Sequence, residues 1–176
     1  MSRVAQILKP FISERRLQAR VRALGRAIRA DYRGRDLILV GILKGSFIFM
    51  ADLARAIEMP LTCDFLRVSS YGSGTVSSGS IRMEFDLSHP VKGKDVVVVE
   101  DIVDTGWTLY HVMKELRGKR PRSLKLAALL HKPERTRVRV PIDYLGFTIP
   151  DRFVVGYGLD FDGRYRNLRH LAVLSA

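Results

Sequence analysis

The chain has 176 residues and a mass of 19.9 kDa, with 47% hydrophobic and 27% charged residues, a composition that fits a soluble globular protein. Its apolar runs are far shorter than the roughly 20 residues of a membrane span, and no signal peptide is recognisable, so a cytoplasmic location is the default expectation. Cys63 is the only cysteine, which excludes an internal disulfide and a cysteine zinc cluster. The net charge of +12 favours anionic partners.

Hydrophobic periodicity predicts strands that alternate with helices, and no linker or repeat divides residues 1–176, which we expect to form one domain. An amphipathic helix is expected to begin after the N-cap Ser13 and to end near Asp31. Further helices are expected at 47–57 and 109–116, and strands at 37–43, 61–68, 81–87, 96–99, 124–130, 142–147 and 153–157.

This alternation predicts an α/β fold with a mostly parallel twisted sheet and helices on both faces. Ligands of such sheets bind beyond the carboxyl ends of the strands. Five charged residues each follow an apolar run and are therefore expected at one site: Lys44, Glu100, Asp101, Lys132 and Asp160.

Residues 96–109 carry the strongest functional signal. A run of four valines predicts a buried strand, Glu100 and Asp101 follow it, and the polar turn Asp104-Thr105-Gly106-Trp107-Thr108 precedes a helix. A glycine-containing loop at a helix N-terminus offers free backbone N–H groups and a positive dipole to a phosphate, and the threonines add hydroxyl donors. Capping explains Asp104 or Thr105 but leaves the two acids unexplained. Carboxylates suit sugar hydroxyls or Mg²⁺, so a ligand with both phosphate and ribose fits the segment.

The segment resembles the phosphoribosyl-diphosphate (PRPP) binding motif of type I phosphoribosyltransferases. Over nearly the whole chain the sequence is similar to the hypoxanthine–guanine branch of that family, in its bacterial form. The resemblance implies the type I phosphoribosyltransferase fold with a small hood, and a homodimer or homotetramer. The segments that carry it are Leu43-Lys44-Gly45-Ser46, Ser69-Ser70-Tyr71-Gly72, Leu130-His131-Lys132-Pro133, 153–160 and Tyr165-Arg166-Asn167-Leu168.

The resemblance assigns the contacts with PRPP. It implies that Lys44 and Gly45 contact pyrophosphate, in a loop that often contains a non-proline cis peptide. Residues 69–80 would form a mobile lid, from which Ser70 and Tyr71 reach the pyrophosphate. Arg166 would donate to the pyrophosphate as well, and Mg²⁺ would be held by Glu100, Asp101 and Asp160.

The resemblance also assigns the purine contacts. It implies that Lys132 donates to the 6-oxygen of the base, that Phe153 stacks on the ring and that the Val154 backbone reads its edge. Sequence alone favours a core position for Phe153. Asp104 would be the catalytic base that takes a proton from the purine, and residues 104–108 would hold the 5-phosphate. At the variable position of the motif, Trp107 is unusual and either narrows the pocket mouth or packs on a neighbouring subunit.

The expected reaction is purine salvage: a Mg²⁺-dependent transfer of 5-phosphoribosyl from PRPP to hypoxanthine, and to guanine, which gives IMP or GMP and pyrophosphate. One alternative is an RNA-binding regulator with the same fold, for which the basic first forty residues are the main support. Another is a different base, xanthine or uracil. The sequence contains neither the glycine motif of a dinucleotide-binding dehydrogenase nor that of a P-loop protein, which argues against both classes.

Overall fold

The computed structural model describes residues 7–70 and 81–175, with side chains for 8–68 and 84–175. A six-stranded sheet of order β4-β3-β2-β5-β6-β7 forms its centre. All neighbours in this sheet are parallel except β3 and β4. The strands are β2 (Leu37–Leu43), β3 (Thr62–Ser70), β4 (Ile81–Phe85), β5 (Asp95–Val103), β6 (Ser123–His131) and β7 (Tyr144–Thr148).

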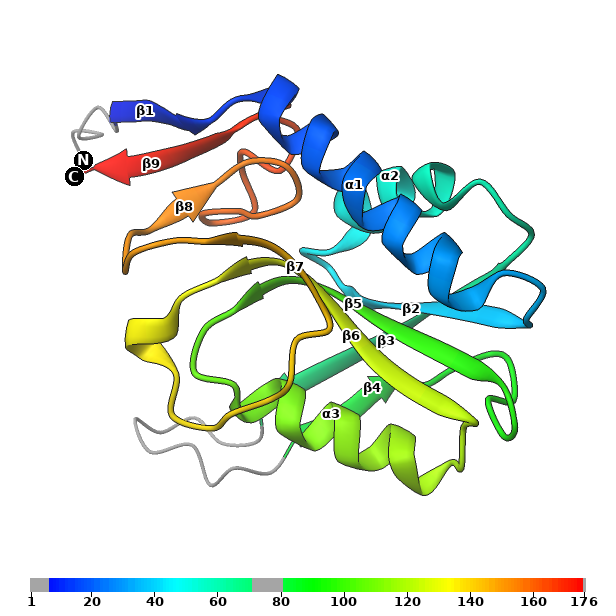
Figure 1. Ribbon diagram of the computed structural model, residues 1–176. Helices are drawn as coiled ribbons and strands as arrows, with labels where there is room; N and C mark the ends of the chain where they lie inside the picture. The colour runs from blue at the N-terminus through cyan, green and yellow to red at the C-terminus, as the bar shows by residue number, and fades with distance from the viewer. Residues whose placement is uncertain (1–6, 71–80, 176) are drawn as a thin grey trace.

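Helices cover both faces of this sheet, as Figure 1 shows. On one face lie α1 (Glu14–Tyr32) and α2 (Phe47–Ile57), and on the other lies α3 (Trp107–Gly118). Each face has its own core: alternate residues of β5, such as Val97 and Val99, pack with α1 and α2, whereas Val96 and Val98 pack with α3. The expected α/β architecture is therefore confirmed. No helix in the described part of the chain combines the length and apolarity that a membrane crossing requires.

A second sheet forms a hood beside the carboxyl ends of the central strands (Figure 1). It contains β1 (Ile7–Ile12), β9 (Leu171–Ser175) and the two-residue strand β8 (Val154–Val155), all antiparallel. The strand predicted at 153–157 is thus shorter than expected and belongs to the hood. The two strands β1 and β9 were not predicted.

The remaining boundaries differ by a few residues. Strand 37–43 and helix 47–57 are confirmed at both ends, whereas β5 continues through the two acids to Val103 and α3 begins two residues earlier, at Trp107. The strand predicted at 81–87 ends at Phe85, which is 50% exposed and not buried as the alternation implied. A short 3-10 helix, Pro133–Arg135, follows β6.

Candidate active site

The turn between β5 and α3 forms a cradle with free backbone donors. Gly106 is the N-cap of α3, has a φ of +86° and provides no side-chain cap. A Cβ at this position would lie 2.1 Å from the carbonyl oxygen of Val138, so only glycine fits. Since no side chain caps the helix, its first N–H groups remain available to an anion. A cavity of about 120 Å³ lies here, lined by Glu100, Ile102, Asp104, Thr105, Gly106, Thr108 and Leu109.

Trp107 does not close this cradle. Its ring is 43% exposed and stacks on His111, with 6.4 Å between ring centroids. Its exposed position on α3 is compatible with both alternatives for Trp107, narrowing of the pocket mouth and contact with a neighbouring subunit, and both stay hypotheses.

Two carboxylates follow one another at the end of β5, Glu100 lining the cavity at the start of α3 and Asp101 lying against the loop after β2. Oε2 of Glu100 is buried and has no hydrogen-bond partner within residues 8–68 and 84–175. Burial, together with the charge of Asp101, raises the pKa of Glu100 well above its ordinary value. Burial also raises the pKa of Asp101, to about 6, although the N–H of Ile102 donates to Asp101 Oδ1 at 2.7 Å. An unpartnered buried carboxylate is expected where a cation or a hydroxyl is to be bound.

The loop after β2 lies against Asp101. The peptide bond between Leu43 and Lys44 is cis, and Lys44 is exposed. A Cβ on Gly45 would lie 1.5 Å from Asp101 Oδ2, so the glycine allows the loop backbone to lie directly against the carboxylate. On its other side, the carbonyl oxygen of Gly45 would be 2.1 Å from a Cβ on Gly158. The loop after β2 is therefore in close contact with Asp101 of β5 on one side and with Gly158, between β8 and β9, on the other.

Tyr157 fixes the position of the hood loop, the segment 156–170 between β8 and β9. Its side chain is buried and its hydroxyl donates to Asp52 Oδ2 of α2 at 2.5 Å, beside Gln18 Nε2 at 2.7 Å. Because α2 directly follows the loop that contains Gly45, this contact fixes the hood loop relative to that loop.

The segment after Tyr157 carries two charged residues of the expected site, Asp160 and Arg166. Arg166 donates to the carbonyl oxygen of Gly158 at 2.5 Å and forms an ion pair with Asp160 at 2.6 Å. The charges of both residues influence the pKa of Asp101, Arg166 lowering and Asp160 raising it. The structure thus brings Asp101, Asp160 and Arg166 into one electrostatic neighbourhood.

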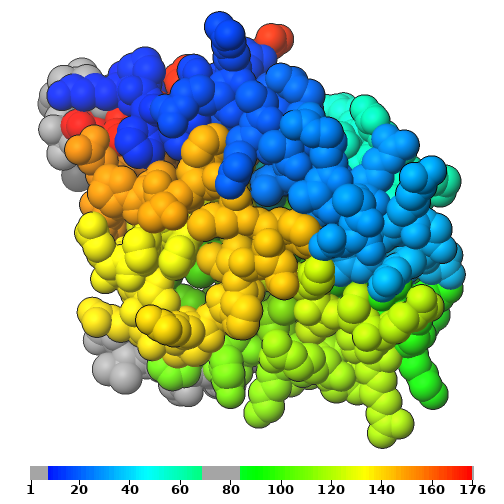
Figure 2. Space-filling view, viewed as in Figure 1, coloured from blue at the N-terminus to red at the C-terminus, as the bar shows by residue number. Residues whose placement is uncertain are grey.

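The loop after β6 contributes a nearly buried cation. Lys132 is 7% exposed and its Nζ lies 3.3 Å from Asp151 Oδ1. Phe153 is 52% exposed, contrary to the core position that sequence alone favoured, and its ring meets the edge of Phe161 with 5.7 Å between centroids. Val154 is buried in β8. Figure 2 shows the loop after β6, in yellow, at the surface between the orange hood segment and α3, in green.

Comparison with known proteins identifies the family. Residues 13–162 match the family model of the phosphoribosyl transferase domain. The chain belongs to the phosphoribosyltransferase family. It is 50% identical over 168 residues to a hypoxanthine-guanine phosphoribosyltransferase of Dictyostelium discoideum, covering 93% of each chain. It is 47% identical over 170 residues to that of Mycobacterium tuberculosis strain H37Rv, covering 93% of this chain and 84% of the relative.

Structures and longer relatives agree with this phosphoribosyltransferase assignment. The fold is similar to that of a hypoxanthine phosphoribosyltransferase from Staphylococcus aureus, with a TM-score of 0.92, 41% identity and coverage of 95% and 91% of the two chains. The chain is also 47% identical to part of the bifunctional protein TilS/HprT of Listeria innocua, but spans only 26% of its length.

Several expected site residues of this phosphoribosyltransferase remain untested. Tyr71 and most of the expected lid lie outside the described residues, and Ser70 is described only as the last backbone position of β3. No group of three or more His, Cys, Asp or Glu side chains arranged to hold a metal occurs in the described part. Magnesium is commonly bound through one or two carboxylates together with substrate phosphates, so the prediction that Glu100, Asp101 and Asp160 hold it stays a prediction.

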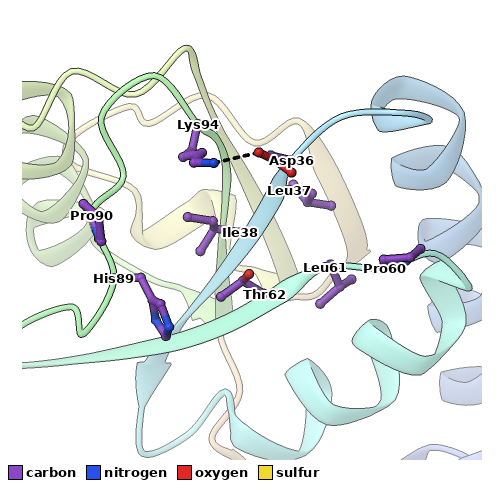
Figure 3. Close-up of a pocket in the computed structure, with 9 residues that line it drawn as sticks. All are labelled: Asp36, Leu37, Ile38, Pro60, Leu61, Thr62, His89, Pro90 and Lys94. Carbon is purple, nitrogen blue, oxygen red and sulfur yellow. Dashed lines mark hydrogen bonds and ion pairs between the residues drawn. The ribbon is translucent and has the colours of Figure 1, made fainter.

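A larger pocket lies away from this site. Its volume is about 370 Å³. Figure 3 shows it at the amino ends of β2 and β3, which is the opposite end of the strands from the cradle. Its polar groups are already paired: Lys94 lies 2.6 Å from Asp36, and His89 Nδ1 lies 3.0 Å from the buried Asp64. These pairs explain the local fold, so we do not assign the pocket to the phosphoribosyl chemistry.

Proposed function

We propose that this phosphoribosyltransferase acts on 6-oxopurines: it transfers 5-phosphoribosyl from PRPP to hypoxanthine and guanine and releases pyrophosphate. The observation that carries the proposal is the nearly buried Lys132, whose backbone N–H donates at 2.9 Å to the carbonyl oxygen of Val103, the residue directly before the phosphate cradle at 104–108. A fixed cation favours the 6-oxygen of hypoxanthine or guanine and disfavours the 6-amino group of adenine, because both would be donors. The names of the relatives support the same substrates.

PRPP is bound at three places in this proposal. The free N–H groups at the start of α3, with Thr105 and Thr108, receive the 5-phosphate far from the reacting bond and fix its orientation. Glu100 and Asp101 receive the ribose hydroxyls. The backbone around Gly45 and the side chains of Lys44 and Arg166 receive the pyrophosphate, as do Ser70 and Tyr71 of the expected lid.

Charge stabilisation follows from the same arrangement. Departure of pyrophosphate leaves positive charge on the ribose ring, and the two carboxylates at the end of β5 favour that charge. The Asp101 carboxyl, with its pKa of about 6, is ionised at pH 8. Glu100, Asp101 and Asp160 would hold Mg²⁺, which when bound neutralises the pyrophosphate.

The purine is placed between the hood and the loop after β6. Phe153 offers an exposed side chain for stacking on the purine, and the Val154 backbone would read the edge of the base. Asp104 accepts the proton that the five-membered ring of the purine loses as the new bond to ribose forms. Because its side chain is on the cradle loop, the proton acceptor is tied to the same element that holds the 5-phosphate.

The test is an assay of four bases, hypoxanthine, guanine, xanthine and uracil, each with PRPP and Mg²⁺, with adenine as the control. Formation of IMP and GMP, without AMP, is expected. Absence of product with hypoxanthine and guanine, combined with salt-sensitive RNA binding, would instead support the RNA-binding regulator.

A further inference from the structure

Four alternating charges connect the two sides of the proposed purine pocket. Arg135 Nε donates to Asp104 Oδ1 at 2.6 Å, and Arg135 Nη1 lies 3.4 Å from Asp151 Oδ2. The other oxygen of Asp151 lies 3.3 Å from Lys132 Nζ. One guanidinium and one carboxylate therefore stand between the expected proton acceptor and the expected reader of the 6-oxygen.

The chemistry of the base explains why such a connection is useful. In hypoxanthine the 6-oxygen accepts hydrogen bonds, and the neighbouring imidazole nitrogen on the same edge carries a proton to be removed. A complementary site needs a cation and a carboxylate close together. Two opposite charges that lie close together attract each other strongly in a partly buried pocket. If they paired directly, neither would be available to the purine.

We propose that Arg135 and Asp151 are positioning residues that prevent this direct pairing and direct Lys132 and Asp104 towards the purine. The proposal rests on the 6-oxopurine function described above. Arg135 gives Asp104 a cationic partner other than Lys132, and Asp151 gives Lys132 an anionic partner other than Asp104. Each partner uses only part of the hydrogen-bonding capacity of the group it holds.

The hydrogen bonds agree with this role. Arg135 engages Oδ1 of Asp104, and within the described residues Asp104 Oδ2 has no hydrogen bond, so it is free to accept the purine proton. The ammonium of Lys132 has three donors, of which Asp151 takes one.

The backbone around Arg135 is fixed on the phosphate cradle. The N–H groups of Arg137 and Val138 both donate to the carbonyl oxygen of Thr105 at 3.0 Å, and the Thr136 hydroxyl donates to the carbonyl oxygen of Lys132 at 3.2 Å. A side chain on this segment therefore starts from a fixed place relative to Asp104 and Lys132. Positioning residues act well when their own support is rigid.

The test compares Arg135→Gln with Arg137→Gln in steady-state assays with hypoxanthine and PRPP. Both variants lose one exposed positive charge from the same loop, but within the described residues Arg137 has no side-chain hydrogen bond or ion pair. Arg135→Gln is expected to raise KM for hypoxanthine about tenfold, with KM for PRPP within about twofold of the parent protein. Arg137→Gln is expected to match the parent protein in both constants.

Two further variants separate positioning from folding. Asp151→Asn breaks the other end of the connection and is expected to give the same selective rise in KM for hypoxanthine. Arg135→Lys keeps the charge but lacks the planar fork that reaches two carboxylates, so about a threefold rise is expected. Thermal unfolding of each variant shows whether it is folded, and Arg135→Lys supplies the measurement if Arg135→Gln is not.

The outcomes distinguish this proposal from the function on which it rests. If the parent protein makes IMP and Arg135→Gln behaves like Arg137→Gln, the positioning role is wrong and the function stands. Equal rises in KM for hypoxanthine and PRPP would also overturn the positioning role. If the parent protein makes no IMP or GMP, the proposed function itself fails.

Discussion

Replacing Asp101 by asparagine should make the metal-free protein more stable while lowering its activity. The structure raises the pKa of this carboxyl from 3.8 to about 6, because burial opposes its charge. Such a shift costs the folded state about 3 kcal/mol at pH 8, where the carboxyl must be ionised. The amide removes this cost and keeps the size of the side chain and an acceptor for the N–H of Ile102. We expect the protein to keep Asp101, despite this cost to its stability, because the carboxylate binds substrate.

The pH dependence gives this prediction its specific form. Since the pKa in the folded state lies above that in the unfolded state, the contribution of Asp101 to stability is fully present below about pH 4. It is lost progressively as the pH rises to about 6. The advantage of Asp101→Asn should therefore be about 3 kcal/mol at pH 8 and about half of that at pH 5.

Urea denaturation in the presence of a chelator measures this advantage at the two pH values. The exposed substitution Asp36→Asn, which removes a carboxyl from a surface ion pair, is a control whose effect should be small. An advantage of Asp101→Asn that is absent at pH 8, or is the same at pH 5 and pH 8, would refute the reasoning about burial.

Three further substitutions test other parts of the site. Gly106→Ala should cost about 2 kcal/mol or more in urea denaturation, because the residue has a φ of +86° and its Cβ would lie 2.1 Å from the oxygen of Val138; an unchanged midpoint would contradict that contact. Tyr157→Phe should lower the free energy of unfolding by about 1 kcal/mol through loss of the bond to Asp52, and a neutral result would show that this anchor is unimportant. Phe153→Ala should raise KM for hypoxanthine about tenfold or more without a change in Tm, since the ring is 52% exposed; an unchanged KM would exclude stacking.

Local sequence signals predicted the central sheet well because each of its strands and helices has a recognisable pattern of apolar residues within its own segment. The continuous apolar run at 37–43 and the periodic run at 47–57 match β2 and α2 at both ends. The acids at 100 and 101 and the cradle glycine, Gly106, were also recognised, since a strand, a polar turn and a helix follow one another directly in the sequence.

The hood was less predictable because it depends on partners far apart in the chain. β1 contains Lys9 and Pro10 in the middle of an otherwise apolar segment rather than a regular alternation, and it becomes a strand only by pairing with β9. The roles of Arg135 and Asp151 were missed for a related reason. In the sequence, Arg135 is one of several basic residues after β6, and only the folded chain shows which carboxylates it reaches.

The pairing of β1 with β9 has a consequence for the order in which the protein acquires its parts during synthesis. The ribosome produces β1 before every other described strand, yet its partner β9 is the last of the described strands to be made. The central sheet and the loop at 104–108 can form while β1 is still without its partner strand. The nascent protein would therefore possess its phosphate cradle before the segment with Asp160 and Arg166 takes its place near Asp101.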